Sequence, residues 1–303
     1  MKRRWLVLGR LRPALLGAAL GGVLELVRAR RRWTPLPLHD KVVVLTGAAG
    51  GIGGATARAF AAQGARLVLA DRRDGPLNAV QQELASYGVA TLIVPTDIRR
   101  DDELDVLLDS TLRTFGRLDV LVNLAGLALG GPFQEQDPAR LREMVETNVV
   151  GSLRLTQLAL PVMLAQGNGH IVVVSSTTAP VPTPGLCSYG ATKAALRYFA
   201  HALRHELAGT GVRVSAVLPG WTRTAMVAAV PEGPIRAAGI APDEPEAVAE
   251  AILRAVRYDL PEVALGGSRT ALFFLLQRFF PGLMGHLWRP LLTPEYLDAV
   301  RRL

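Results

Sequence analysis

Short apolar runs rich in β-branched residues recur along most of the chain, separated by stretches long enough to hold a helix. Most of these runs are nearly free of polar residues, which is typical of strands that are buried on both faces of a parallel sheet. The pattern predicts strands at Val42–Thr46, Arg66–Ala70, Thr91–Val94, Val120–Asn123, His170–Ser175, Arg213–Leu218 and Glu262–Leu265.

The segments between these runs carry apolar residues at helical spacing, as in Gly54–Gln63 and Glu244–Val256. Strands that alternate with helices predict an α/β fold, with a doubly wound parallel sheet of the Rossmann type and helices on both faces. We expect this single catalytic domain to span residues 40–267, with a short substrate lid and hydrophobic helices at both ends of the chain.

The net charge of +8 is confined to the N-terminal segment. Residues 1–33 hold nine Lys and Arg residues and a single acid, Glu25, so the rest of the chain has no basic excess. A body without basic excess does not favour the phosphate backbone of a nucleic acid, and we expect no nucleic-acid partner. The single cysteine, Cys187, excludes an internal disulfide.

Residues 1–33 place the apolar stretch Pro13–Val27 between two basic clusters. The stretch is shorter than the roughly 20 residues of a membrane-spanning helix. We therefore expect a helix that lies in an anionic membrane surface and holds the protein on the cytoplasmic side; packing on the domain or on a dimer partner is the alternative.

The C-terminal segment 268–303 is also apolar and is rich in phenylalanine between residues 271 and 280. We expect it to share the membrane surface, to close over a substrate pocket, or to become buried between subunits.

A glycine-rich turn follows the first predicted strand directly. Gly47, Gly51 and Gly53 stand between Val42–Thr46 and a predicted helix, where glycines let the backbone approach a pyrophosphate at the helix N-terminus. The second predicted strand leads into Asp71, 18 residues after Gly53, at the spacing of an acid that binds ribose hydroxyls. This acid favours NAD, whereas the adjacent Arg72 and Arg73 leave NADP as the alternative.

Tyr189 and Lys193 stand at positions i and i+4 of a predicted helix, on one face and about one turn apart. A tyrosine is a poor proton shuttle at neutral pH unless a nearby positive charge stabilises its phenolate, and Lys193 is placed to supply that charge. Ser176 ends a predicted strand 13 residues before Tyr189. His201 and His205 have metal-ligand spacing but lack the other residues of a metal motif, so we expect no metal site.

Over residues 40–267 the sequence resembles the short-chain dehydrogenase/reductase family. The resemblance rests on several motifs that occur in the family's order, with one departure, Leu124 in place of an asparagine. The matching residues are Thr46, Gly47, Gly51, Ile52 and Gly53 in the glycine motif; Asp97 and Ile98 after the third strand; Asn123, Ala125 and Gly126 after the fourth; Asn148 on a helix; Ser176, Tyr189 and Lys193; and Pro219, Gly220, Thr222 and Thr224 in the turn beside the nicotinamide.

The resemblance implies a role for each of these residues. Tyr189 acts as general acid in reduction and general base in oxidation, and Ser176 holds the substrate oxygen. Lys193 lowers the pKa of Tyr189 and bonds the nicotinamide ribose, and Asn148 anchors a water that links Lys193 to solvent. The remaining motif residues and Arg72 contact the cofactor, NAD or NADP. The family also implies a homodimer or homotetramer.

The expected function is hydride transfer between a nicotinamide and the carbonyl or alcohol carbon of a small substrate. The family's lid corresponds to residues 221–245 and is apolar here, which favours a lipophilic alcohol or ketone such as a steroid, a retinoid or a fatty chain. A soluble 3-oxoacyl-type reductase is the alternative with the same chemistry. A non-catalytic nucleotide-binding scaffold is disfavoured because both Tyr189 and Lys193 are present.

Overall fold

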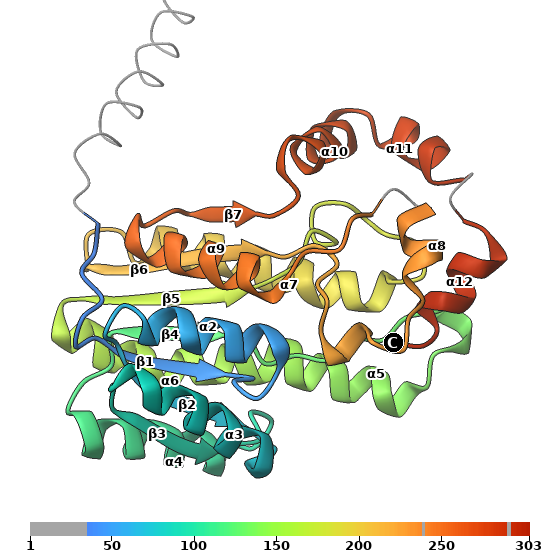
Figure 1. Ribbon diagram of the computed structural model, residues 1–303. Coiled ribbons are helices and arrows are strands. Elements are labelled where there is room, and N and C mark those ends of the chain that lie inside the picture. The colour runs from blue at the N-terminus through green and yellow to red at the C-terminus, as the bar shows by residue number, and fades with distance from the viewer. Residues whose placement is uncertain (1–34, 238–239, 290–291) are drawn as a thin grey trace, which may run out of the picture. The chain divides into compact units, whose positions relative to one another are not determined.

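The computed structural model describes residues 35–237, 240–289 and 292–303. The N-terminal segment 1–33, which we predict to associate with a membrane, lies outside the described residues. The chain divides after Leu36, and the unit Pro37–Leu303 contains the predicted catalytic domain (Figure 1).

Parallel strands form one seven-stranded sheet in the order β3-β2-β1-β4-β5-β6-β7, which confirms the predicted doubly wound fold (Figure 1). The central strands are buried along their whole length, as their uninterrupted apolar runs predict. The strands are β1 (Val42–Thr46), β2 (Arg66–Asp71), β3 (Thr91–Pro95), β4 (Val120–Asn123), β5 (Gly169–Val174), β6 (Val212–Leu218) and β7 (Glu262–Ala264).

The strand order reverses between β1 and β4. Strand β1 pairs with β2 on one side and with β4 on the other, so that Val43 lies between Leu67 and Val120. The loops after β1 and β4 therefore leave the sheet toward opposite faces and open a crevice at its carboxyl edge. This topology fixes where a nucleotide site can form.

Helices cover both faces of the sheet. On one face, α2 contacts both α3 and α9; on the other, α4, α6 and α7 pack through a shared apolar cluster (Figure 1). The helices of the unit are α2 (Gly51–Ala61), α3 (Asp74–Leu84), α4 (Asp101–Phe115), α5 (Pro138–Val145), α6 (Ser152–Gln166), α7 (Cys187–Glu206), α8 (Glu232–Ala237), α9 (Pro245–Arg257), α10 (Gly267–Phe279), α11 (Pro281–Trp288) and α12 (Pro294–Val300), with shorter helical turns at Ala85–Tyr87, Phe133–Glu135, Glu146–Gly151 and Ala225–Val227.

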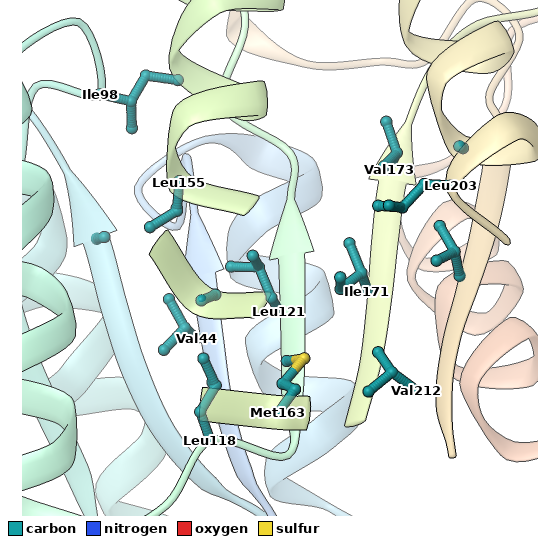
Figure 2. Close-up of a cluster of buried hydrophobic side chains, with 14 of the residues drawn as sticks. Val44, Ile98, Leu118, Leu121, Leu155, Met163, Ile171, Val173, Leu203 and Val212 are labelled. Atoms are coloured by element: carbon teal, nitrogen blue, oxygen red, sulfur yellow. The ribbon is translucent and has the colours of Figure 1, made fainter. Parts of the chain in front are cut away.

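The larger apolar cluster lies between the central strands and helices α4, α6 and α7 (Figure 2). Leu121 and Ile171 project from neighbouring strands toward Met163 of α6, and all three are fully buried. Truncating one such side chain to alanine costs about 2–5 kcal/mol of stability. This cluster holds β4, β5 and α7 together, so it positions the predicted catalytic residues Tyr189 and Lys193 on α7 and Ser176 just after β5.

Among the described residues, one continuous helical run is long and apolar enough to cross a membrane, the 29-residue stretch Pro138–Gln166. It combines α5, the π-helical turn Glu146–Gly151 and α6. Leu155, Ala159 and Met163 of this run are buried against the sheet. The apolar character of this run is accounted for by its place in the core.

The C-terminal helices are set beyond the last strand. Helices α10 and α11 follow β7, and α12 then packs against α8 through a second apolar cluster that includes Ile235, Tyr296 and Val300. The Tyr296 hydroxyl donates a hydrogen bond to the carbonyl of Pro184, 3.1 Å away in the loop before α7. This bond ties the end of the chain to the loop that leads into α7, which carries Tyr189.

Candidate active site

A cavity of about 720 Å³ lies at the carboxyl edge of the sheet. Its walls include the glycine turn after β1, the segments that follow the other strands, the helix that carries Tyr189 and Lys193, and the C-terminal helices α10, α11 and α12. Most of the nucleotide-binding and catalytic residues predicted from the sequence therefore face one common space.

The glycine turn is built for close backbone contact. Gly47 adopts a φ of +69°, and a methyl group on Gly53 would lie 2.1 Å from the Gly47 carbonyl oxygen, so neither position accepts a side chain without a shift. The Thr46 hydroxyl accepts hydrogen bonds from the backbone N–H groups of Leu124 and Ala125, both at 3.1 Å. These bonds join the turns after β1 and β4, so the crevice has a fixed shape.

The glycine cradle at the N-terminus of α2 suits the pyrophosphate of a dinucleotide. Gly47, Gly50, Gly51 and Ile52 line the cavity there, and they leave the backbone accessible instead of filling it with side chains. Helix N-terminal amides at such a turn favour an anionic group. The residues present therefore fit an NAD(P) cofactor.

Asp71 lies at the carboxyl end of β2 and faces the cavity. Its carboxylate accepts hydrogen bonds from the backbone N–H of Ala49 at 3.3 Å and from Arg73 at 3.2 Å. Arg72 also lines the cavity, and its guanidinium pairs with Glu143 at 3.4 Å. Each of the two neighbouring arginines is thus engaged by a carboxylate.

Asp97 and Ile98 extend the same wall after β3. Arg99 donates hydrogen bonds to the Asp97 carboxylate, and this interaction lowers the pKa of Asp97 below its usual value. Ile98 lies against Gly151 of the π-helical turn, where a methyl group would come within 2.5 Å of the Ile98 carbonyl oxygen. The segment after the third strand is therefore in direct contact with the helical turn that carries Asn148.

Tyr189 and Lys193 lie one turn apart on α7, and both line the cavity. The Lys193 ammonium nitrogen lies 5.7 Å from the centre of the Tyr189 ring and donates a hydrogen bond to the Val174 carbonyl at 3.1 Å. Burial raises the pKa of Tyr189 to about 12, and a hydrogen bond with Ser176 acts in the opposite direction. Burial lowers the pKa of Lys193 to about 8.

These shifts refine the role expected of Lys193. Burial is the largest influence on the pKa of Tyr189, and the lowering influence that accompanies it comes from Ser176. With a pKa of about 8, Lys193 is still mostly protonated at neutral pH, and its charge is then available to stabilise a phenolate that forms during a reaction.

Asn148 lies behind the cavity wall, fully buried in the π-helical turn Glu146–Gly151. Its amide oxygen accepts from the Leu127 N–H at 2.7 Å, and its amide nitrogen donates to the Leu127 carbonyl at 2.9 Å and to the Thr192 hydroxyl at 3.0 Å. Asn148 thereby connects the loop after β4 to α7 beside Lys193. A methyl group on Gly126 would lie 3.1 Å from the Asn148 oxygen and 3.4 Å from the Lys193 nitrogen, so the three residues meet at one point.

Most of the predicted cofactor contacts face the cavity, but three of them do not line it. Thr46 and Asn123 are buried, and Asn123 donates to the Thr156 hydroxyl at 2.9 Å. Gly53 packs against the turn itself. These three residues shape the site from behind, as Asn148 does. The predicted residues that do line the cavity are Gly47, Gly51, Ile52, Asp71, Arg72, Asp97, Ile98, Ala125, Gly126, Ser176, Tyr189, Lys193, Pro219, Gly220, Thr222 and Thr224.

One of the two histidines with metal-ligand spacing on α7, His201, pairs with an acidic side chain. His201 pairs with Glu262 at 2.8 Å, and Arg197 donates to the same carboxylate at 2.6 Å. Across the described parts of the chain, no group of three or more metal-ligating side chains is found.

The apolar part of the cavity lining comes from the predicted lid and from the C-terminal helices, and only the lid residues were predicted. Ala225, Met226 and Val227 of the predicted lid line the cavity, whereas Val230 and Ile235 pack against α12. Motif reasoning missed the residues that α10, α11 and α12 contribute; the apolar composition of segment 268–303 was the available signal. These residues are Thr270, Phe273, Phe274, Met284, Leu287, Trp288 and Tyr296.

Residues 41–234 match the family model of the short chain dehydrogenases. The chain belongs to this family. The match covers the glycine turn, the π-helical turn with Asn148 and the catalytic helix α7, and it confirms the resemblance drawn from the sequence motifs. The chain is thus an oxidoreductase with a nucleotide-binding fold.

Relatives within the short chain dehydrogenases extend the comparison. An uncharacterised oxidoreductase of Staphylococcus aureus is 36% identical over 219 residues, which span 72% of this chain and 92% of the relative. Dehydrogenase/reductase SDR family member 7B of Danio rerio is 34% identical over 281 residues, covering 88% of this chain and 91% of the relative. The second similarity extends well beyond the residues matched by the family model.

Solved structures of similar fold include two reductases. The 3-ketoacyl-(acyl-carrier-protein) reductase of Brucella melitensis, solved with NADH, superposes with a TM-score of 0.71 at 28% identity and covers 77% of this chain and 99% of its own. A single-substitution variant of the actinorhodin polyketide ketoreductase, solved with NADPH, has a TM-score of 0.70 at 30% identity and covers 75% of this chain and 96% of its own.

Proposed function

We propose that the protein is an NAD-dependent dehydrogenase or reductase that interconverts a lipophilic ketone and its alcohol. The observation that carries the proposal is that one cavity is lined both by Ser176, Tyr189 and Lys193 and by large apolar side chains of α10–α12.

The proposed chemistry uses three side chains around the substrate oxygen. In reduction, the Tyr189 hydroxyl gives its proton to the carbonyl oxygen while the Ser176 hydroxyl holds that oxygen in place; oxidation is the reverse. Lys193, 5.7 Å from the tyrosine ring, stabilises the negative charge that develops on Tyr189. When bound, the nicotinamide supplies or accepts the hydride. The cradle that would hold it consists of the glycine turn and Asp71.

The arrangement around Asp71 supports NAD over NADP. A carboxylate at this position binds ribose hydroxyls and repels a 2′-phosphate. Arg72 and Arg73, the two cations that would have to bind that phosphate, pair instead with Glu143 at 3.4 Å and with Asp71 itself at 3.2 Å. NADP would need these pairs to break.

The apolar end of the cavity supports a lipophilic substrate. Phe273, Phe274, Leu287 and Trp288 enclose it, and together with the lid residue Met226 they offer large apolar surfaces and few polar partners. Phe273 and Leu287 are each 42% exposed, so a ligand that covered them would remove apolar surface from water, which is favourable by about 25 cal/mol for each Å² covered. A small polyol would leave this surface without partners.

The test is a substrate panel with purified full-length protein, run against NADH and NADPH separately. The panel contains a steroid ketone, a retinal, a long-chain ketone, a 3-oxoacyl thioester and a sugar. We expect turnover of the lipophilic carbonyls with NADH, and no turnover by the Tyr189→Phe variant, which retains cofactor binding. Preference for the 3-oxoacyl thioester with NADPH would establish the alternative reductase, and turnover of the sugar alone would refute the lipophilic assignment.

We also propose a subunit interface on α7 and on the run Pro138–Gln166. Large apolar side chains are exposed on both: Tyr198 on α7, and Val145 and Val150 on the other run. Light scattering of the purified protein is expected to report a dimer or tetramer, and Tyr198→Asp to shift it toward monomer.

Residues 1–33 are proposed to attach the protein to an anionic membrane surface on the cytoplasmic side, on the strength of their charge and apolar stretch. Fractionation of cells that express the full chain or a chain without residues 1–33 tests this location.

A further inference from the structure

Helices α10 and α11 are apolar on the side that faces the cavity and also on the side that faces outward. Thr270, Phe273 and Phe274 of α10 stand at i, i+3 and i+4 and line the cavity. Leu272, Leu275 and Phe279 of the same helix stand at i, i+3 and i+7, on the opposite face. Among the described side chains of both helices, only Met284 is buried.

Large apolar side chains of α10 and α11 and of the junction between them are exposed and do not line the cavity; we call this set the outer face. It lies at the edge of the unit beyond β7 (Figure 1). A helix that is apolar all round is normally buried, because water on one side favours polar residues there. The outer face consists of Leu272, Leu275, Phe279, Phe280 and Leu283, which are between 49% and 63% exposed.

The chain segment that carries the outer face has charge of one sign. Residues 263–294 contain Arg269, Arg278 and Arg289 and no aspartate or glutamate. Arg278 and Arg289 are exposed in the structure. Exposed large apolar residues with arginines and no acids match a bilayer surface that carries anionic headgroups.

The outer face belongs to the same two helices that wall the cavity. Phe273 of α10 and Leu287 of α11 line the cavity, and each is 42% exposed. We propose that α10 and α11 insert their outer face into an anionic lipid surface and that the substrate enters the cavity directly from the acyl-chain region. The lipid contact stands on its own evidence, whereas the entry route rests on the proposed function.

Local labelling tests the lipid contact independently of residues 1–33. In a Cys187→Ser background, Leu275→Cys or Phe279→Cys carries an environment-sensitive fluorophore, and Val106→Cys on α4 is the control, because Val106 and Leu275 are both 55% exposed. The full-length protein is mixed with phosphatidylcholine vesicles that contain phosphatidylserine, with or without bromine atoms in the acyl chains.

We expect a blue shift and bromine quenching for the labels at positions 275 and 279, and neither for the label at position 106. Unchanged fluorescence at 275 and 279, with or without attachment of the protein to the vesicles, would overturn the proposal. A change that appears on raising the protein concentration without vesicles would mean that a second copy covers the outer face, and would also overturn it.

Kinetics test the entry route. The variant Leu275→Ser/Phe279→Ser is compared with Val106→Ser/Phe133→Ser, whose residues have matching exposure. We expect the first variant to raise KM about tenfold for a long-chain ketone embedded in vesicles, because two half-exposed apolar side chains lose their lipid contact. Its kinetics with a short water-soluble ketone should not change.

An equal loss of activity on both ketones would show that the outer face is merely structural and would refute the entry route. If the wild-type protein turns over neither ketone, the proposed function fails, and the labelling result alone decides the lipid contact.

Discussion

Lys193→Met tests how the catalytic tyrosine is made to work. Methionine has a similar length but no charge, so the substitution removes the ammonium that lies 5.7 Å from the Tyr189 ring centre. It also removes the donor to the Val174 carbonyl, 3.1 Å away. The first loss acts on the reaction and the second on stability, and the two are measured separately.

The size of the catalytic effect follows from the distance. With the 5.7 Å to the ring centre taken as the separation of the two charges, the Lys193 ammonium stabilises the phenolate by about 3 kcal/mol at an effective dielectric constant of about 20. A barrier raised by that amount slows the reaction by about a hundredfold or more. Burial has already raised the pKa of Tyr189 to about 12, so the loss of this charge leaves little to offset the cost of forming the phenolate.

The assay is kcat for ketone reduction at saturating NADH across a range from about pH 6 to about pH 10, which brackets the titration of Lys193. Lys193 loses its proton as the pH rises through about 8, so the wild-type rate falls above that pH. The variant should be about a hundredfold slower near neutral pH. It should also lack the fall in rate at alkaline pH, which we call the alkaline limb. A variant rate close to that of the wild type, or a retained limb near pH 8, would refute the electrostatic role.

Ser175→Ala is the matched control for a purely structural effect. The Ser175 hydroxyl donates to the backbone carbonyl of Lys193 at 2.7 Å, so its loss disturbs the same residue without touching the charge. Each variant removes one hydrogen bond to a backbone carbonyl, which costs about 0.5–3 kcal/mol in urea unfolding, with the larger loss for the charged donor. Only Lys193→Met should abolish the alkaline limb.

Three further predictions concern stability and the cofactor. Burial lowers the pKa of His170 from 6.5 to about 3, so between these pH values the unfolded chain binds a proton that the folded chain does not, and the free energy of unfolding falls as the pH falls. His170→Asn removes this proton and should reduce the slope of unfolding free energy against pH by up to about 1.4 kcal/mol per pH unit. An unchanged slope in urea titrations would contradict this prediction. Asp71→Ala should weaken NADH binding about tenfold or more in fluorescence titrations, and should therefore reduce the ratio of the affinity for NADH to that for NADPH. An unchanged ratio of the two affinities would contradict the contact between Asp71 and the ribose. Gly53→Ala should cost about 1–3 kcal/mol in unfolding and weaken NADH binding, because the new methyl group would meet the Gly47 carbonyl oxygen at 2.1 Å; full stability in urea titrations would contradict the tight packing of the turn.

The sheet could be predicted from the sequence because burial on both faces leaves a simple pattern. A strand such as β4 is buried on both faces, so apolar and polar residues do not alternate along it. The strand predicted from its apolar run and the strand in the structure both span Val120–Asn123. Helical spacing likewise places Tyr189 and Lys193 on one face of α7. Both inferences depend on residues close together in the chain.

The supporting contacts of the site could not be predicted, because they join residues far apart in the chain. The Thr46 hydroxyl accepts hydrogen bonds from the N–H groups of Leu124 and Ala125, which are 78 and 79 positions further along the chain. Asn148 donates a hydrogen bond to Thr192, 44 positions further along. A motif gives the identity of these residues but not the direction of their side chains. This is why Thr46 and Asn148, expected at the cofactor or at a water beside Lys193, lie behind the cavity wall and hold it in place.

The C-terminal helices mark the limit of what helical periodicity can predict. A helix with one apolar stripe reveals which side is buried, but α10 carries large apolar residues on both sides, so its pattern fits a pocket wall, a membrane contact and a subunit interface equally well. The structure decides one side, because Phe273 and Phe274 line the same cavity as Tyr189 and Lys193. Since half-exposed Leu275 and Phe279 then occupy the other side, a second apolar environment is needed, and the surrounding arginines select an anionic lipid surface over a second copy of the same basic segment. The same two helices, α10 and α11, would then determine both which substrates enter the cavity and where the enzyme finds them.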